Sequence, residues 1–458
     1  MNMLGYRIIR DYGVIMIRKI KWNNHIVLEN LELNLCRSNG EECNTIILAG
    51  ENGTGKTTIL EGIQQFLKCE KNEFIEYVEY SIREEQYKFI NDTEKGLFNK
   101  RIKNNTTEES VETNRYYNFD ELLNDKEDIR SYGILYSKAN TGFITSSISS
   151  ISNLHVDTQK IEDDEEVDYT QIKQLLIDLS VQDSLEWTEI SKIKENVSYE
   201  DYLKRTRISR FRNAFNNFFE SLKFKRVDSG RVTFDIIFEK NGKEIKIDDL
   251  STGELQIVYR GAYLLRNCKN VYGGVVLIDE PELSMHPKWQ MKILNYYRDL
   301  FTENGVQKVQ MIFATHSEYI LKEAVKDSDN ILILILKDNA GKITADSVEN
   351  SDIVLPSITA AEINYLIFDI LSIDYHIELY GYLQSKYNKN YIIECDDFIF
   401  NHSLYDSNKH YKSRQYNNTI YKTLPTFIRN AIDHPNSGCV YTEEELRESI
   451  KLLRDLCR

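Results

Sequence analysis

The segment Gly50-Glu-Asn-Gly-Thr-Gly-Lys-Thr57 constrains the fold more than any other part of the chain, because it fits the pattern G-x-x-x-x-G-K-[ST] in full. The residues before it predict a strand over 44–49, and the apolar spacing after it predicts a helix with one buried face over 59–67. Glycines let backbone N–H groups approach phosphate oxygens, and the helix start adds partial positive charge. The order of strand, loop and helix therefore predicts a nucleotide phosphate site in an α/β fold.

The residues of this loop divide into two roles. Lys56 is expected to reach the β and γ phosphates, and the Thr57 hydroxyl is expected to bind Mg²⁺. The other candidates for binding ATP are Gly50, Asn52, Gly53, Thr54, Gly55 and Thr58. ATP and Mg²⁺ are accordingly the expected cofactors.

A second apolar strand, Val275-Val-Leu-Ile278, ends in two acids. Ligands bind at the carboxyl ends of strands in open α/β sheets, so Asp279 is expected to hold Mg²⁺ there. Glu280 follows directly and is the natural group to polarise an attacking water.

Two further motifs narrow the class of ATPase. Leu250-Ser-Thr-Gly-Glu-Leu-Gln256 precedes the acidic strand, and Phe313-Ala-Thr-His-Ser317 follows it. In this order the four motifs resemble the Walker A, signature, Walker B and switch-histidine motifs of the ABC ATPase family. Pro281 and His286-Pro287 are similar to the branch that includes the RecF, Rad50 and OLD-type ATPases. The resemblance covers roughly residues 16–340.

The resemblance implies a mechanism that uses two copies. Two heads would join head to tail, and ATP on Lys56 of one copy would be completed by Ser251, Gly253 and Glu254 of the other. His316 would sense the γ phosphate beside the catalytic Glu280. The family's Q-loop glutamine has three candidates by position, Gln64, Gln65 and Gln86.

The expected architecture has two parts. Residues 16–360 form an α/β ATPase head with a largely parallel sheet and a helical lid inserted at about 70–245, which includes a helix over 209–224. Residues 361–458 form an all-α bundle with helices over 360–387, 423–433 and 442–456, and the boundary lies near 355–365. Thr442 and Glu445 make a capping box at the start of the last helix.

The helix over 423–433 carries Arg429-Asn430 and then His434. This pattern resembles the signature of HEPN ribonucleases, whose sites form where two copies meet. The resemblance implies cleavage of RNA without metal: Arg429 grips the phosphate, Asn430 orients it, and His434 acts as acid or base on the 2′-OH. The alternative is structural, with His434-Pro435 ending the helix and Arg429 paired with Asp433.

Composition limits the partners. A net charge of −15 argues against indiscriminate nucleic-acid binding, and the longest apolar run, 331–336, is far too short to span a membrane. Seven cysteines without a C-x-x-C pair indicate reduced thiols in a cytoplasmic protein rather than a zinc site. The basic run 204–212 is either a contact for phosphate or a partner, or a solvated helix face paired to acids.

Three functions are compatible with these motifs. The first is an ABC ATPase that gates its own HEPN ribonuclease, an anti-phage toxin that resembles the PrrC and RloC anticodon nucleases in layout, with RNA, tRNA included, as substrate. The second is a regulatory ATPase that resembles PtuA of Septu systems, which works with a separate HNH nuclease, so that a nuclease or inhibitor is the partner. The third is a DNA-repair head of the RecF or Rad50 kind, against which the absence of sustained heptads counts.

Overall fold

The computed structural model describes residues 14–92, 94–111, 125–139, 142–152, 154–158, 161–163, 169–193, 198–204, 206–230, 232–416 and 419–458. Its backbone divides into two compact units. The first runs to Ile320 and takes in Asp329–Ser347, and the second consists of Leu321–Ser328 and Val348–Arg458. The division at Val348 lies upstream of the boundary expected near 355–365.

A seven-stranded sheet in the order β18-β17-β3-β16-β13-β8-β9 forms the centre of the first unit. Its strands are β3 (Thr45–Gly50), β8 (Ile134–Ser137), β9 (Ile161–Asp163), β13 (Val275–Asp279), β16 (Gln310–Thr315), β17 (Ile331–Asn339) and β18 (Lys342–Ser347). All neighbours pair in parallel except β17 and β18. Every residue of β3, β13 and β16 is buried, as expected for parallel strands covered on both faces. The largely parallel sheet of the sequence prediction is confirmed.

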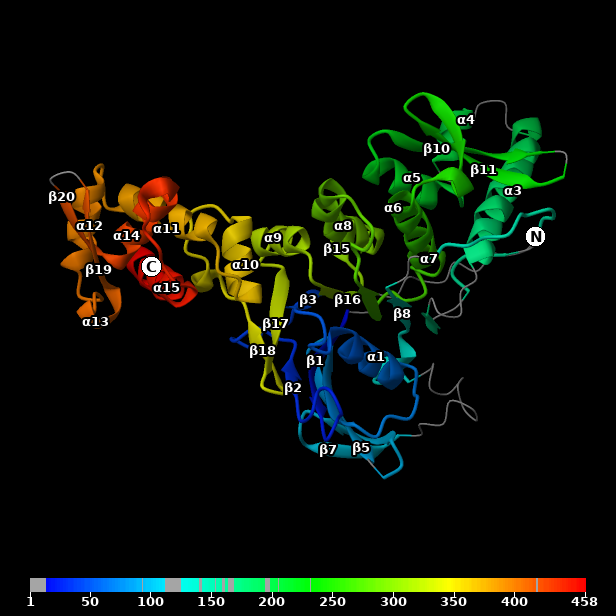
Figure 1. Cartoon of the computed structure of the whole chain (residues 1–458). Coiled ribbons are helices and arrows are strands. Elements are labelled where there is room, and N and C mark those ends of the chain that lie inside the picture. The colour runs from blue at the N-terminus through cyan, green and yellow to red at the C-terminus, as the bar shows by residue number, and fades with distance from the viewer. Residues whose placement is uncertain are drawn as a thin grey trace. The chain divides into compact units, whose positions relative to one another are not determined.

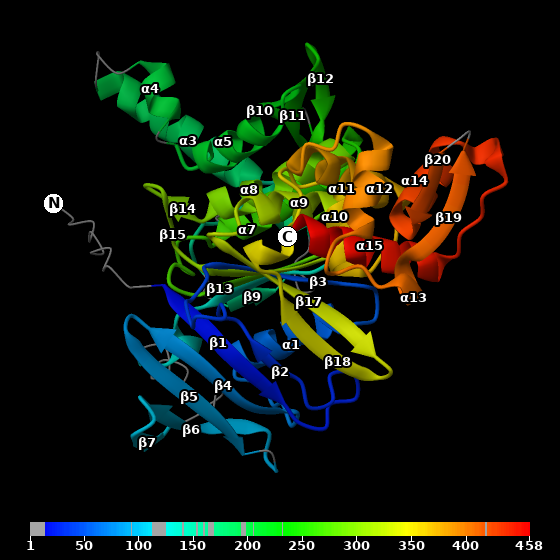
Figure 2. The same ribbon diagram turned by 90° about the vertical axis from the view of Figure 1, so that its left-hand side faces the viewer.

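Alternate residues of these strands face two different layers. Ile46 and Leu48 belong to one hydrophobic core with α1 (Lys56–Leu67) and the strands of a second sheet. Both ribbon views place α1 on this face of the central sheet and α7 (Gly261–Arg266) and α8 (Pro287–Leu300) on the other (Figures 1 and 2). The phosphate loop is therefore held between a buried strand and a helix packed under the sheet.

The second sheet of this unit is antiparallel and corrects the extent of the expected lid. Its order is β2-β1-β4-β5-β6-β7. The strands are β1 (Ile15–Trp22), β2 (Glu32–Asn34), β4 (Ile75–Ile82), β5 (Glu85–Asp92), β6 (Leu97–Lys103) and β7 (Thr107–Ser110). Because β4 pairs with β1, residues 75–110 complete this sheet and are not part of a helical lid.

The rest of the insertion mixes helices with strands. It contains α3 (Tyr169–Ile193), α4 (Tyr199–Leu203), α5 (Ser209–Phe218), β10 (Leu222–Ser229), β11 (Phe234–Lys240) and β12 (Lys243–Lys246). The helix expected over 209–224 thus ends at Phe218, where Phe219 turns to an extended conformation and leads into β10. Helix α6 (Thr252–Leu255) and a π-helical turn, Gln256–Arg260, then connect the insertion to α7.

The second unit is mainly helical, but it is not the all-α bundle that the sequence predicted. Its helices are most of α9 (Glu318–Lys326), α10 (Ala360–Phe368), α11 (Ile373–Lys386), α12 (Ile392–Phe400), α13 (Ser407–His410), α14 (Leu424–Asp433) and α15 (Glu443–Cys457). The strands β19 (Tyr411–Tyr416) and β20 (Thr419–Thr423) form an antiparallel hairpin. The helix expected over 360–387 breaks at Asp369, whose φ of 52° ends α10. The capping box of Thr442 and Glu445 is confirmed.

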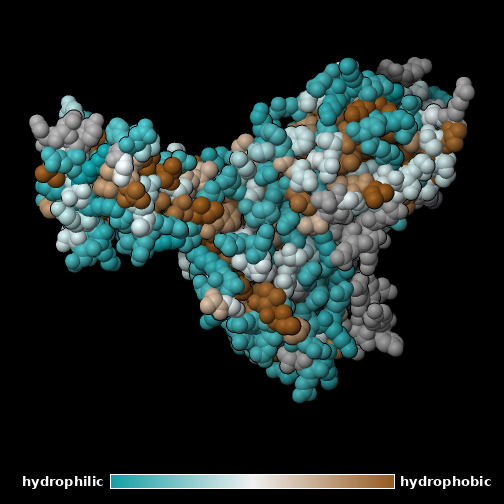
Figure 3. All heavy atoms as spheres, viewed as in Figure 1, coloured by the Kyte–Doolittle hydropathy of each residue, from teal (hydrophilic) through white to brown (hydrophobic). Residues whose placement is uncertain are grey.

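The surface shown in Figure 3 is mostly hydrophilic, with apolar residues in scattered groups. Among the described residues, the helices are all too short or too polar to cross a lipid bilayer.

Candidate nucleotide site

Four strand ends meet at one edge of the central sheet. Because β3, β16, β13 and β8 run parallel as neighbours, their carboxyl ends at Gly50, Thr315, Asp279 and Ser137 lie along the same edge. This is the edge where ligands bind in open α/β sheets. The structure therefore brings together the phosphate loop, the acidic strand end and the switch-histidine segment that the sequence singled out.

The phosphate loop has a backbone that only glycine tolerates at two positions. A Cβ on Gly50 would lie 2.5 Å from the carbonyl oxygen of Leu336 on the neighbouring strand. Gly55 has a φ of 85°, and its Cβ would meet Leu28 at 2.5 Å. A side chain at either position would therefore displace the loop that leads from β3 into α1, which begins at Lys56.

Lys56 is buried and folds its side chain across the loop. Its ammonium donates to the carbonyl oxygens of Gly50 at 2.8 Å and Glu51 at 2.7 Å. Burial lowers the pKa of Lys56, while the nearby acids, Asp279 first among them, oppose that shift. A desolvated ammonium in this position has a strong electrostatic preference for phosphate oxygens.

Thr57 and Asp279 fit a magnesium ion. The Thr57 hydroxyl donates to Asp279 Oδ2 at 2.8 Å. The other oxygen, Oδ1, is buried and has no hydrogen-bond partner among the described residues, and burial raises the pKa of this carboxyl group. Mg²⁺ takes one or two protein oxygens together with substrate phosphates and water. A hydroxyl and an under-coordinated carboxylate oxygen beside a phosphate loop form such a donor set.

Glu280, the residue after Asp279, has its side chain close to that of His316. Glu280 has a left-handed backbone, with φ of 42°, which turns the chain sharply after β13. Its Oε1 lies 3.8 Å from Nδ1 of His316. A third group, Glu282, is buried, and its Oε1 accepts from the Thr315 hydroxyl at 2.6 Å and from the His316 backbone N–H at 3.0 Å. Glu282 thus holds the segment that carries His316, a role that the sequence analysis missed.

The signature segment, residues 250–256, also belongs to the first unit and contains helix α6. Ser251 is exposed at the start of α6, and both its backbone N–H and its hydroxyl donate to Glu254 Oε2. Glu254 is buried and pairs with Lys240 on β11 at 2.7 Å. A Cβ on Gly253 would lie 2.9 Å from the Ser284 carbonyl oxygen and 3.1 Å from the Trp289 ring. Glu254 therefore stabilises the turn at Ser251 from within the same chain.

Arg260 connects the signature helix to the nucleotide edge. It is fully buried, and its guanidinium donates to the carbonyl oxygens of Asp279 at 2.7 Å and Glu280 at 3.0 Å. It also donates to the hydroxyl and carbonyl oxygens of Ser137 at 2.9 and 3.1 Å. The sequence offered one signal for this residue, an arginine in an otherwise apolar helix four residues after the signature.

None of the three glutamine candidates lies at this edge. Gln64 and Gln65 are in the third turn of α1, where the Gln65 side chain accepts from Asn72, and Gln86 is on β5 of the antiparallel sheet. The strand end beside Asp279 belongs instead to Ser137 at the end of β8. The sequence did not reveal this strand because it is only four residues long.

The C-terminal motif lies at the end of α14, with Arg429 and Asn430 inside the helix and His434 as its C-cap. Arg429 pairs with Asp433 Oδ2 at 2.7 Å and donates to Asn430 Oδ1 at 3.0 Å. Asn430 is buried, while His434 is exposed and ends the helix. The guanidinium is therefore engaged as the structural alternative predicted, and it is open to a phosphate only when that ion pair breaks.

Known proteins are similar to this chain over parts of its length. A Retron Vc95 probable ATPase from Vibrio cholerae is 34% identical over 108 residues, which is 21% of this chain and 20% of that protein. The Septu protein PtuA from Bacillus thuringiensis is 31% identical over 23% of this chain and 27% of its own length. PtuA from Bacillus mycoides is 21% identical over 69% of this chain and 40% of its own length. The chain thus spans between a fifth and two fifths of these relatives.

Solved structures also align with it. An SMC head bound to the C-terminal winged-helix domain of ScpA superimposes with a TM-score of 0.44 at 13% identity, over 73% of this chain and 99% of that one. The SMC head domain from Thermotoga maritima superimposes with a TM-score of 0.39 at 15% identity, over the same share of each chain.

A family profile covers the nucleotide site itself. It matches residues 46–322, which begin in β3 and include the phosphate loop, the signature segment, the acidic strand end and His316. This match takes in more than half of the chain. The chain therefore belongs to the AAA domain family described as putative AbiEii toxin, Type IV TA system.

Proposed function

We propose that this chain is an ATP-hydrolysing regulator of an anti-phage defence system, and that it acts on a separate effector protein. The observation that carries the proposal is the contact between Thr57 and Asp279 beside Lys56, with Glu280 and His316 next to it. These five side chains can bind a nucleoside triphosphate and activate water. The sequence similarity to retron and Septu ATPases supports the defence role.

Each residue of the set has a defined task in hydrolysis. Lys56 leaves the Gly50 and Glu51 carbonyl oxygens for the phosphates, where its charge is neutralised. Thr57 and Asp279 would hold Mg²⁺, which would supply positive charge to offset the phosphate oxygens. Glu280 orients and deprotonates the attacking water. The Glu282 carboxylate accepts from the His316 backbone N–H and so keeps the His316 ring close to Glu280.

The head is expected to close as a pair. Ser251 is exposed and, among the described residues, its hydroxyl donates only to Glu254 in the adjoining helix, so it is available to a second copy. ATP would join the two copies by placing its charge between Lys56 of one and Ser251 of the other. Hydrolysis would then release the pair and change the state of the effector.

A second candidate keeps the effector in the same chain. Arg429 and Asn430 lie in the last turns of α14, and the exposed His434 follows as the residue that ends the helix, an order that favours a ribonuclease site of the HEPN kind. Against this candidate, Asp433 already occupies the Arg429 guanidinium at 2.7 Å. We therefore rank the separate effector first.

A phage-challenge assay separates the two candidates. Cells carrying the chain with its neighbouring genes are compared with cells carrying Lys56→Ala, Arg429→Ala or His434→Ala. The first proposal expects Lys56→Ala to abolish protection and the other two variants to protect. In vitro, the purified chain with ATP should leave total RNA intact. Protection that depends on Arg429 and His434, with RNA products ending in 2′,3′-cyclic phosphates, would establish the second candidate instead.

A further inference from the structure

The basic run 204–212 contains one cation that differs from the others. Its other described cations each have a carboxylate partner within 2.9 Å: Lys204 pairs with Asp201, Arg207 with Asp183 and Glu186, and Arg210 with Asp157. The guanidinium of Arg212 makes no hydrogen bond or ion pair with any described residue, and only its backbone N–H is bonded, to the Ile208 carbonyl oxygen at 3.0 Å. Its guanidinium lies 5.6 Å from the centroid of the Phe224 ring. The other described cations of this run are therefore neutralised by salt bridges, and Arg212 differs from them because its guanidinium forms none.

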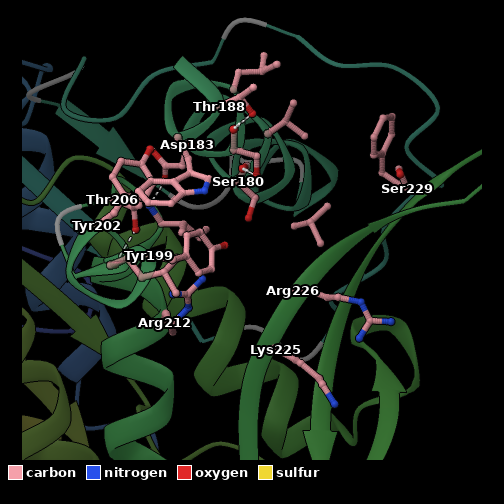
Figure 4. Close-up of a pocket in the computed structure, with 18 residues that line it drawn as sticks. Ser180, Asp183, Thr188, Tyr199, Tyr202, Thr206, Arg212, Lys225, Arg226 and Ser229 are labelled. Carbon is pink, nitrogen blue, oxygen red and sulfur yellow. Dashed lines mark hydrogen bonds between the residues drawn. The ribbon is translucent and has the colours of Figure 1, made fainter. Parts of the chain in front are cut away.

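Arg212 lines a cavity of about 690 Å³ within the first unit. The cavity lies between the second half of α3, helix α4 and strand β10 (Figure 4). Its volume falls in the range of small-molecule sites, which is roughly 300–1,000 Å³. No part of the phosphate loop contributes to it.

Aromatic rings form one wall of this cavity. The Trp187 ring lies 5.1 Å from the ring of Tyr199 and 5.0 Å from that of Tyr202, measured between centroids. Tyr202 is fixed because its hydroxyl donates to the Asp183 carbonyl oxygen at 2.5 Å. Tyr199 is 52% exposed, so its ring has a face open to a ligand. Stacking on such a face stabilises a nucleobase of any identity.

The other charged groups in the wall are already neutralised. Asp183 accepts from Arg207 through Oδ1 and from the Ile208 backbone N–H through Oδ2. On the opposite wall, Lys225 pairs with Glu239 and Arg226 pairs with Glu244. Among the charged residues described in the lining, Arg212 alone forms no salt bridge; burial lowers its pKa, and the nearby Tyr199 and Asp183 oppose that shift. A partly desolvated guanidinium that is not hydrogen-bonded to a carboxylate favours binding of an anion.

We propose that this cavity binds a nucleotide, with the base stacked on Tyr199 and the phosphate paired with Arg212. A planar aromatic surface and a forked cation on neighbouring helices match the two ends of such a ligand. A free mononucleotide and the end of a single strand share this chemistry. The site goes beyond the proposed ATPase, because it is distinct from the phosphate loop and does not depend on it.

The test uses the full chain with Lys56→Ala, so that the phosphate loop does not compete. The probes are the four nucleoside monophosphates and pentamers of oligo(dT) and oligo(U), titrated by calorimetry and by quenching of tryptophan fluorescence. Saturable binding is expected, and Arg212→Ala and Tyr199→Ala should each weaken it about tenfold or more. Arg212→Lys should restore part of the affinity. Lys204→Ala, an exposed cation of the same run, is the matched control and should bind normally.

Several outcomes would overturn the site. These are no saturable binding of any probe, binding that Arg212→Ala and Tyr199→Ala leave unchanged, or an equal loss in Lys204→Ala, which would indicate general charge attraction. If Arg212→Ala does not fold, Tyr199→Ala decides, because its half-exposed ring can be removed without opening a core. Pentamers that bind more tightly than monophosphates identify a strand end as the ligand, and equal affinities identify the free nucleotide.

Discussion

Lys56 is the residue whose charge the nucleotide site needs most directly, since its ammonium is held by two carbonyl oxygens that phosphates can replace. We expect Lys56→Ala to weaken ATP binding by roughly 10- to 100-fold, the loss of one or two hydrogen bonds to a charged group. Calorimetric titration with ATP measures this. Lys95→Ala, which removes an exposed cation paired with Asp92, should bind as the wild type does. Equal affinity in Lys56→Ala would remove this loop from the nucleotide site.

Glu280 is the expected general base, and its side chain is not needed to hold the phosphates. Glu280→Gln should therefore lower the ATP turnover number by about 10²- to 10⁴-fold while ATP still binds. Steady-state phosphate release and a separate ATP titration measure the two effects. A variant that hydrolyses ATP at the wild-type rate would place the base elsewhere.

Glu282 acts through its neighbours, since it accepts from the Thr315 hydroxyl and the His316 backbone N–H. Glu282→Ala removes both hydrogen bonds, and we expect turnover to fall with little change in KM. Glu282→Gln keeps one acceptor oxygen, so it should recover much of that loss. If both variants lose the same activity, or if KM rises instead, Glu282 does not act by positioning His316.

At the scale of elements, α6 approaches the start of α8 so closely that only glycine fits at position 253. Gly253→Ala places a methyl group 2.9 Å from the Ser284 carbonyl oxygen, and overpacking of this kind costs roughly 1–3 kcal/mol. We expect a lower melting temperature and slower turnover with unchanged ATP affinity. Gly381→Ala in α11 is the matched control, because no atom lies within 4 Å of its Cβ position. It should leave the melting temperature unchanged or raise it slightly.

Helices α11 and α15 bury an uncharged imidazole. His376 Nε2 lies 2.9 Å from the Ser449 hydroxyl, and burial lowers its pKa from 6.5 to about 3. The unfolded chain therefore binds a proton below pH 6.5 that the folded chain does not, so stability falls as the pH drops from 6.5 towards 3. At pH 5 the cost is roughly 2 kcal/mol. Urea unfolding at pH 7 and pH 5 should show a smaller decrease for His376→Gln than for the wild type. Equal decreases would mean that His376 is protonated in the fold.

At the scale of the whole molecule, the head-to-tail pair makes a distinctive prediction. Lys56→Ala and Ser251→Arg should each be inactive alone. When the two variants are mixed, a mixed pair contains one site with an intact Lys56 and an intact Ser251. Random pairing should restore about a quarter of the wild-type ATPase activity, as an order-of-magnitude expectation for one working site in half of the pairs.

Two controls accompany the mixing experiment. Mixing Lys56→Ala with Glu280→Gln should restore nothing, because both changes affect the same half of the site. Light scattering of Glu280→Gln with ATP should show the pair directly. Absence of recovery from the first mixture, with each variant folded, would place Ser251 outside a shared site.

The sequence by itself determined the nucleotide edge, because its motifs depend on local geometry. The spacing of Gly50, Lys56 and Thr57 fixes a loop between a strand and a helix, and Asp279 follows a strand that is apolar throughout. The contact of Thr57 with Asp279 follows from placing the two strands in one parallel sheet. The capping of α15 by Thr442 also depends on residues close in the chain, so the sequence predicted it as well.

Tertiary structure alone decided the features that rest on pairing between distant segments. The strand β4 belongs with β1 rather than with a helical lid, and no spacing within 70–110 expresses that partnership. The hairpin of β19 and β20 is mostly polar, so it lacks the apolar alternation that marks a strand. Arg260 donates to the carbonyl oxygens of Asp279 and Glu280 because the folded chain places the last residue of the π-helical turn next to the end of β13. A side chain's chemistry is written in the sequence, but its partners depend on where the folded backbone places it.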